Sequence, residues 1–138
     1  MSPHPQVLVA VSDPESGRAL KTILSDFGLK PVVACSLSEA QAILSKGSVP
    51  LVFCDAQLPG GTFQELLQLT APARIPLVVA ARLPETRQYL EAMSLGAFDF
   101  VAAPFRPADV EHILTNVLRR LPVSTRPRKL RKAAAVAH

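Results

Sequence analysis

The sequence is poor in aromatic residues, in cysteine and in long hydrophobic runs. Trp is absent, and Tyr occurs once and Cys twice among 138 residues. No apolar run approaches the about 20 residues of a membrane-spanning helix, so we expect no membrane segment. Residues 1–5 lack the charged region that opens a signal peptide. Cys35 and Cys54 both fall in apolar, strand-like runs, which argues against a disulfide and favours a reducing, cytoplasmic location.

Acidic residues are missing from one end of the chain. Residues 1–118 hold eight Lys and Arg and all eleven acids, a net charge of −3, whereas residues 119–138 hold seven Lys and Arg and no acid, a net charge of +7. The length and the 49% apolar content predict one globular domain with its own core. We therefore expect a weakly acidic domain over residues 1–121 and a basic, disordered tail over residues 122–138.

The basic tail allows two interpretations. We favour a solvated end or linker stub without fixed structure. Alternatively, its cations pair with the phosphates of nucleic acid, although the tail has no aromatic residue that would stack on bases. The cations available for such pairing are Arg126, Arg128, Lys129, Arg131 and Lys132.

Apolar runs alternate with segments of helical spacing five times along the domain. We expect strands over residues 6–11, 30–35, 51–55, 76–81 and 98–102. Helical segments follow them over residues 13–28, 36–47, 63–69, 84–96 and 110–121. This alternation predicts an α/β fold, a doubly wound, flavodoxin-like (βα)₅ three-layer sandwich whose parallel sheet has strand order 2-1-3-4-5.

One carboxylate ends the central strand. Asp55 follows four apolar residues and is soon followed by Pro59, Gly60 and Gly61. Open α/β sheets bind ligands at the carboxyl ends of their strands, where the strand order reverses. The predicted order makes strands one and three end side by side at that point. Asp55 is therefore the leading candidate for a functional residue, and an Asp that caps the next loop is the simpler alternative.

The remaining polar residues form no recognisable site. His4, His112 and His138 lack Cys, His or carboxylate partners at metal-ligand spacing. Gly60-Gly61 lacks the Lys-Ser/Thr of a phosphate loop and predicts only a turn. The acidic segment after the first strand would repel a flavin phosphate, and no Ser-His-Asp set is present. We therefore expect no enzymatic activity and no cofactor.

Three motifs in register resemble the receiver domain of two-component response regulators, over residues 6–121. The motifs are Asp55 with Leu58-Pro59, then Gly96-Ala97-Phe98-Asp99-Phe100, and finally Ala103-Pro104-Phe105. The resemblance implies the doubly wound fold described above. It also implies that Asp55 matches the residue that accepts a phosphoryl group from a histidine kinase.

The other polar positions of the receiver pattern are not kept. Receivers have an acidic pair after strand one, a hydroxyl after strand four and a Lys after strand five; the matching residues here are Val11 and Ser12, Ala81, and Ala103. Phosphoryl transfer depends on positioning and charge neutralisation, and Mg²⁺ needs several oxygen ligands. We therefore expect a degenerate pseudo-receiver in which Mg²⁺ binding is weak or absent. Asp13 would complete a metal site only through a bulge, and we expect it to cap the first helix.

The resemblance bears on three further positions. Phe100 matches the aromatic switch residue of receivers, and because Ala81 leaves room beside it we expect a fixed rotamer. Phe63 stands where receivers usually have a small residue. The Ala103–Pro104 peptide matches a Lys-Pro bond that is cis in receivers, and we expect a cis bond here as well.

Three functions remain open. The first, which we favour, is a protein-interaction module of phosphorelay signal transduction that binds a histidine kinase or an output protein without being phosphorylated. The second is a single-domain regulator that is still phosphorylated slowly on Asp55. The third is a nucleic-acid-associated protein that acts through its basic tail.

Overall fold

A five-stranded parallel sheet forms the centre of the molecule. The computed structural model describes residues 5–47, 49–81, 91–102 and 105–119. The strands of the sheet are β1 (Gln6–Ala10), β2 (Lys30–Ala34), β3 (Leu51–Asp55), β6 (Leu77–Ala81) and β7 (Asp99–Ala102). Their spatial order is β2-β1-β3-β6-β7, and every neighbouring pair is parallel. This is the predicted order 2-1-3-4-5, so the doubly wound α/β fold is confirmed.

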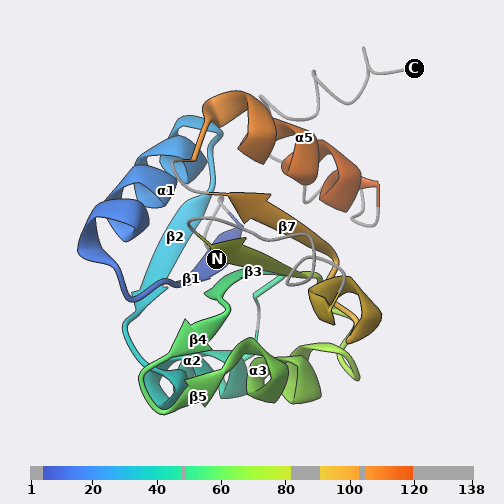
Figure 1. The fold of residues 1–138 in the computed structure, drawn as a ribbon. Coiled ribbons are helices and arrows are strands. Elements are labelled where there is room, and N and C mark those ends of the chain that lie inside the picture. Colours follow the sequence, from blue (N-terminus) through green and yellow to red (C-terminus); the bar gives the residue numbers. More distant parts are fainter. Residues whose placement is uncertain (1–4, 48, 82–90, 103–104, 120–138) are drawn as a thin grey trace.

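Helices cover both faces of the sheet. They are α1 (Pro14–Asp26), α2 (Leu37–Ser45), α3 (Phe63–Thr70) and α5 (Pro107–Leu118), and residues 91–94 are also helical. Figure 1 shows α1 and α5 on one face, and α2 and α3 on the other, which gives the predicted three layers. In the part of the chain that the structure describes, no helix is long and apolar enough to cross a membrane.

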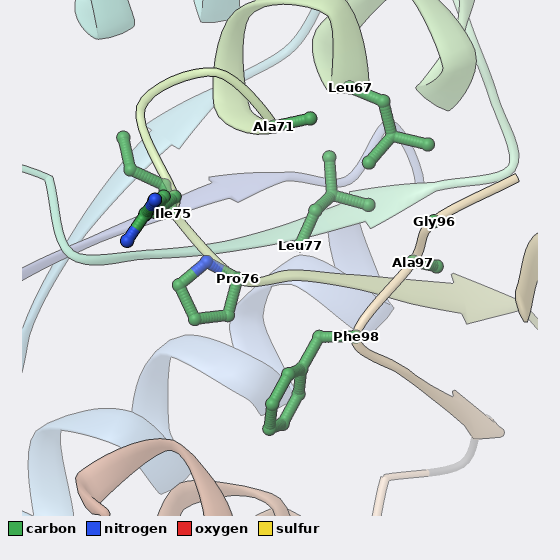
Figure 2. A pocket seen from close by; sticks show the side chains of 9 residues that line it. Leu67, Ala71, Ile75, Pro76, Leu77, Gly96, Ala97 and Phe98 are labelled. Atoms are coloured by element: carbon green, nitrogen blue, oxygen red, sulfur yellow. The ribbon is translucent and has the colours of Figure 1, made fainter. Parts of the chain in front are cut away.

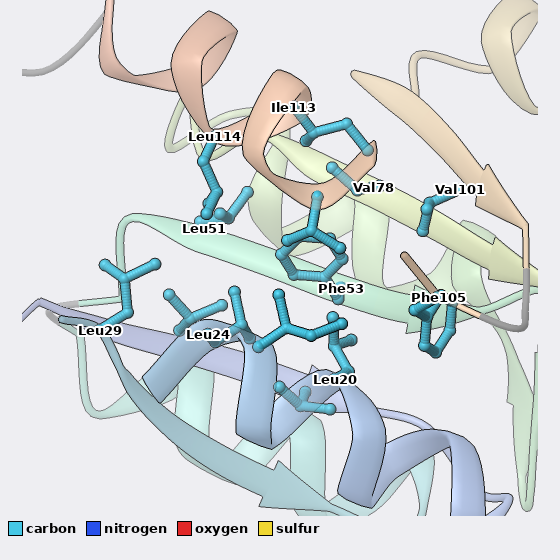
Figure 3. Close-up of a cluster of buried hydrophobic side chains, with 14 of the residues drawn as sticks. Leu20, Leu24, Leu29, Leu51, Phe53, Val78, Val101, Phe105, Ile113 and Leu114 are labelled. Atoms are coloured by element: carbon cyan, nitrogen blue, oxygen red, sulfur yellow. The ribbon is translucent and has the colours of Figure 1, made fainter. Parts of the chain in front are cut away.

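The strands bury side chains on both faces, because successive residues of a strand point to opposite sides of a sheet. The cluster under α1 and α5, called the α1–α5 cluster below, includes Val7, Val9, Leu20, Leu24, Phe53 and Ile113 (Figure 3). The cluster on the other face, the α2–α3 cluster, includes Leu8, Val52, Leu66, Leu67, Leu77 and Val79; Figure 2 shows Leu67 and Leu77 on that side of β6. Burying one such side chain contributes roughly 1.5–3 kcal/mol. This two-sided burial explains the unbroken apolar runs of the sequence.

Several element boundaries differ from the prediction, among them those of the first and second strands and of the last helix. The first strand ends at Ala10 instead of Val11, and the last helix begins at Pro107, where the fixed φ of Pro suits the first turn, and ends at Leu118. The prediction that Cys35 lies in a strand is wrong, because the pairing of β2 with β1 stops at Ala34. Cys35 is exposed, Cys54 is buried in β3, and both thiols are free, as expected.

A short hairpin that the sequence did not predict follows β3. β4 (Gln57–Leu58) pairs antiparallel with β5 (Gly61–Thr62) around a turn at Pro59 and Gly60. Gly60 has φ +98°, a backbone conformation that favours glycine, and Pro commonly precedes such a residue. The Pro59 carbonyl accepts a hydrogen bond from the Leu37 backbone N–H at 3.0 Å, which fixes the hairpin to the start of α2.

Three predictions fall on residues outside this description. They are the start of the helix over residues 84–96, the cis peptide at Ala103–Pro104, and the disordered tail over residues 122–138.

Candidate functional site

Asp55 lies beside Ser12 at the carboxyl edge of the sheet. The parallel pairing of β1 with β3 sets Ala10 against Cys54, so the next residues of both strands lie close together. Asp55 Oδ2 accepts two hydrogen bonds from Ser12, one from the backbone N–H at 2.8 Å and one from the hydroxyl at 3.0 Å. The structure thus brings together two of the predicted site residues, at the point where the strand order reverses.

The environment of Asp55 disfavours its charge. Partial burial raises the pKa of the Asp55 carboxyl, and the nearby Asp13 raises it further, whereas the two hydrogen bonds from Ser12 lower it; the net shift is upward. No Lys or Arg among the described residues forms an ion pair with Asp55. Among the described residues, the donors to this carboxylate are therefore the neutral groups of Ser12.

Asp13 caps helix α1. Its Oδ2 accepts hydrogen bonds from the Ser16 backbone N–H at 3.0 Å and from the Ser16 hydroxyl at 2.7 Å. The cap satisfies one of the N–H groups that the first helical turn leaves without an intrahelical partner. The predicted capping role of Asp13 is confirmed.

Two positions of the receiver pattern, Val11 and Phe63, carry buried apolar side chains. Val11 is 3% exposed and packs in the α1–α5 cluster, so the first position of the acidic pair belongs to the core. Phe63, where receivers usually have a small residue, is buried in the α2–α3 cluster. Phe100 is half-buried against that same cluster, and its fixed rotamer stays a prediction. Ala81 ends β6 opposite Ala102.

Among the described residues, the oxygen atoms around Asp55 form a poor ligand set for Mg²⁺. This cation prefers octahedral coordination by oxygen and is usually held by one or more carboxylates. Here Asp55 Oδ2 already accepts two hydrogen bonds, Ser12 offers only a hydroxyl, and Asp13 is engaged by the helix. Within the described ranges, no group of three or more His, Cys, Asp or Glu side chains could hold a metal ion. Ala103, the fourth altered position, lies outside those ranges.

Cys54 precedes Asp55 but is not poised for chemistry. Burial, and secondarily the charge of Asp55, raise the pKa of the Cys54 thiol far above its usual range. The thiol donates a hydrogen bond to the Asp55 carbonyl oxygen at 3.1 Å. A thiol in this state is protonated at neutral pH and is a poor nucleophile.

The role of Ser12 as the donor to Asp55 was not predicted. The sequence identified Ser12 only as the residue that replaces an acid. The strand order could have revealed the pairing, since it places the ends of strands one and three side by side.

Comparison of sequences identifies related regulators. The chain is 30% identical, over 129 residues, to the "Probable transcriptional regulator ycf27" of Cyanidium caldarium; the match covers 90% of this chain and 50% of that protein. It is also 30% identical, over 103 residues, to the phosphate regulon transcriptional regulatory protein PhoB of Klebsiella pneumoniae, covering 72% of this chain and 45% of the relative. The chain thus spans about half the length of the curated relatives it matches. No family model matches it.

Comparison with solved structures identifies the same fold in response regulators. A two-component response regulator from Clostridium difficile superposes with a TM-score of 0.76 at 21% identity, covering 85% of this chain and 98% of that one. The chemotaxis response regulator CheY4 of Vibrio cholerae gives a TM-score of 0.73 at 20% identity, covering 83% and 99%. At these identities the similarity establishes the fold.

Proposed function

We propose that this chain is a response-regulator receiver domain in a degenerate form that acts by protein–protein interaction without phosphorylation. In this proposal it takes part in two-component signal transduction. Its partner is a histidine kinase or an output protein.

The observation that carries the proposal is the pair of hydrogen bonds from Ser12 to Asp55 Oδ2. A receiver that is phosphorylated needs cations around the transferred phosphoryl group, because the reaction depends on charge neutralisation. At this edge Asp55 instead meets a neutral hydroxyl and a backbone N–H. A charge-assisted hydrogen bond is roughly twice as strong as a neutral one, and each about 1.4 kcal/mol lost from the transition state slows a reaction tenfold.

One observation favours a second candidate function, slow phosphorylation on Asp55. Its other carboxylate oxygen, Oδ1, accepts no hydrogen bond from a described residue. An oxygen without a donor retains its nucleophilic lone pairs. The two candidates make opposite predictions for one measurement.

That measurement is the intact mass of the protein after incubation with acetyl phosphate. Under the proposal the mass stays unchanged, and Asp55→Asn binds the same partner proteins as the wild type in a quantitative pull-down. A gain of one phosphoryl group, lost in Asp55→Asn and accompanied by altered partner binding, would establish the second candidate instead.

The basic tail carries the remaining possibility, contact with nucleic acid, and it is tested separately. DNA affinity of the full chain would be compared with that of a chain ending at Leu121, across a range of salt concentrations. Pairing of tail cations with phosphates predicts a steep loss of affinity with salt that the shortened chain lacks. Equal and weak binding by both chains would identify the tail as a linker or a solvated end.

A further inference from the structure

A groove of about 660 Å³ opens at the edge of the sheet opposite Asp55. It surrounds the amino end of β6, whereas Asp55 lies at the carboxyl end of β3. Figure 2 shows Leu67 and Ala71 on the α3 side of β6, and the rings of Pro76 and Phe98 on the other side. The lining consists of Gly96, seven apolar residues and a single charged side chain, that of Arg74.

Arg74 has a backbone conformation that favours glycine. Its φ is +58°, and it is the only non-glycine residue with positive φ in the part of the chain that the structure describes. The Arg74 N–H donates to the Ala71 carbonyl at 3.1 Å, and the Ile75 N–H donates to the Thr70 carbonyl at 2.9 Å. This pattern is the Schellman motif that ends helix α3, and its left-handed position is most often glycine. An arginine at this position therefore carries a side chain that helix termination does not require.

Arg74 is the only charged residue among those that line the groove. Arg74 is exposed, and no described Asp or Glu forms an ion pair with it. An unpaired guanidinium presents a planar fork of donors that matches a carboxylate with two parallel hydrogen bonds. The adjoining apolar wall can cover a hydrocarbon body, and the volume lies within the roughly 300–1,000 Å³ of small-molecule sites.

We propose that this groove binds a small organic anion, with its carboxylate on Arg74 and its apolar body against residues such as Ile75 and Phe98. The occupant contacts residues 96–98, which lead into β7. In this proposal the domain responds to a ligand without using Asp55. The test of the groove is therefore independent of the proposed function.

The test uses octanoate as the probe and 1-octanol as its uncharged counterpart. Each is titrated into the full chain while the backbone amide signals are followed by NMR. We expect saturable shifts confined to the groove, including the amides of Arg74, Gly96 and Ala97, with octanoate binding more tightly than octanol. Arg74→Gly removes the cation and suits the left-handed backbone, so this variant should fold and bind octanoate roughly tenfold or more weakly.

Arg18→Ala is the matched control. Arg18 is exposed on α1, so this variant changes the net charge equally without touching the groove, and its octanoate affinity should equal that of the wild type. The proposal is wrong if octanoate gives no saturable shifts in the groove, if octanol binds as tightly, or if Arg74→Gly binds octanoate normally. Shifts that follow protein concentration alone would identify an interface between copies and would also overturn it. Thermal unfolding of each variant confirms that it is folded.

Discussion

Asp55 combines a candidate functional position with an unfavourable electrostatic environment. Burial and Asp13 disfavour its charge, and Ser12 compensates in part by donating two hydrogen bonds. The sequence identified Asp55 because a carboxylate that ends a buried strand is conspicuous. It could not identify the contact with Ser12, which depends on two side-chain rotamers and on the register of β1 against β3.

This environment makes the stability effect of Asp55→Asn depend on pH. The fold raises the pKa of the Asp55 carboxyl above its value in the unfolded chain. The wild type therefore loses stability as the pH rises from the pKa of the unfolded chain through the higher pKa of the folded protein. The amide oxygen of Asn can still accept both hydrogen bonds from Ser12. We expect Asp55→Asn to melt at a higher temperature than the wild type near pH 7, with the gain disappearing as pH falls below about 4.

Thermal unfolding at both pH values measures this change in melting temperature, and Glu91→Gln, at an exposed position, should show no such gain. An Asp55→Asn melting temperature at or below that of the wild type near pH 7 would contradict the assignment.

Thr70 offers a second prediction at the residue scale. Its hydroxyl is the only buried side-chain polar atom among the described residues that lacks a hydrogen-bond partner. Replacing such a group by an apolar group of the same shape removes a desolvation penalty, so Thr70→Val should be neutral or should stabilise the fold by up to about 1 kcal/mol. Urea unfolding measures the change. Thr22→Val serves as the comparison, because Thr22 is exposed and its hydroxyl donates to the Arg18 carbonyl. A clear loss of stability in Thr70→Val would mean that the hydroxyl has a partner such as a buried water.

At the scale of elements, the sequence predicted the buried strands and helices, but it did not predict features that depend on strand pairing. Strands that are covered on both faces need unbroken apolar runs, and these runs are visible in the sequence. The end of β2 was not, because it is set by where its pairing partner β1 ends. The hairpin of β4 and β5 was missed because two-residue strands have no periodicity to detect. Leu69, the last residue of the helical segment predicted over residues 63–69, is 44% exposed, since the helix turns that position away from the sheet.

The cap of α1 gives a prediction that separates capping from metal binding. Asp13→Ala should lower the free energy of unfolding by about 1 kcal/mol, because Ser16 loses its acceptor, whereas Asp13→Asn should retain most of the stability. Chemical denaturation with and without millimolar Mg²⁺ measures both effects. If Mg²⁺ stabilises the wild type but not Asp13→Asn, the Asp13 carboxylate binds the metal and the donor set around Asp55 has been misjudged.

At the scale of the whole molecule, the fold and the site differ in how they are encoded. The fold follows from five repeats of one pattern, and each repeat supports the others. A receiver site needs single residues at the ends of β1, β3, β6 and β7 together. By the resemblance to receivers, Asp55 at the end of β3 is the one polar position that this sequence keeps. The strand ends lie outside the buried apolar runs that direct the fold, so the proposed degenerate receiver requires changes at the site only.

The last prediction restores those groups on the unchanged fold. Ser12→Asp, Ala81→Thr and Ala103→Lys together supply the second carboxylate, the hydroxyl and the cation that receivers have. The Ser12 hydroxyl already lies 3.0 Å from Asp55 Oδ2, so a carboxylate at position 12 places its oxygens beside Asp55. Two adjacent carboxylates repel each other, and Mg²⁺ relieves this repulsion. The triple variant should therefore be stabilised by Mg²⁺ in thermal unfolding, unlike the wild type.

The triple variant should also gain one phosphoryl group from acetyl phosphate, roughly tenfold or more faster than the wild type, in a reaction that needs Mg²⁺. Intact mass measures this, and adding Asp55→Asn should abolish the gain. Each single substitution supplies only one of the three missing contributions, so none alone should give the full rate. If the triple variant is stabilised by Mg²⁺ but stays unlabelled, then buried Val11, which lies in the core where receivers have the first acid, accounts for the missing activity. If the wild type is labelled as fast as the triple variant, the pseudo-receiver proposal is wrong.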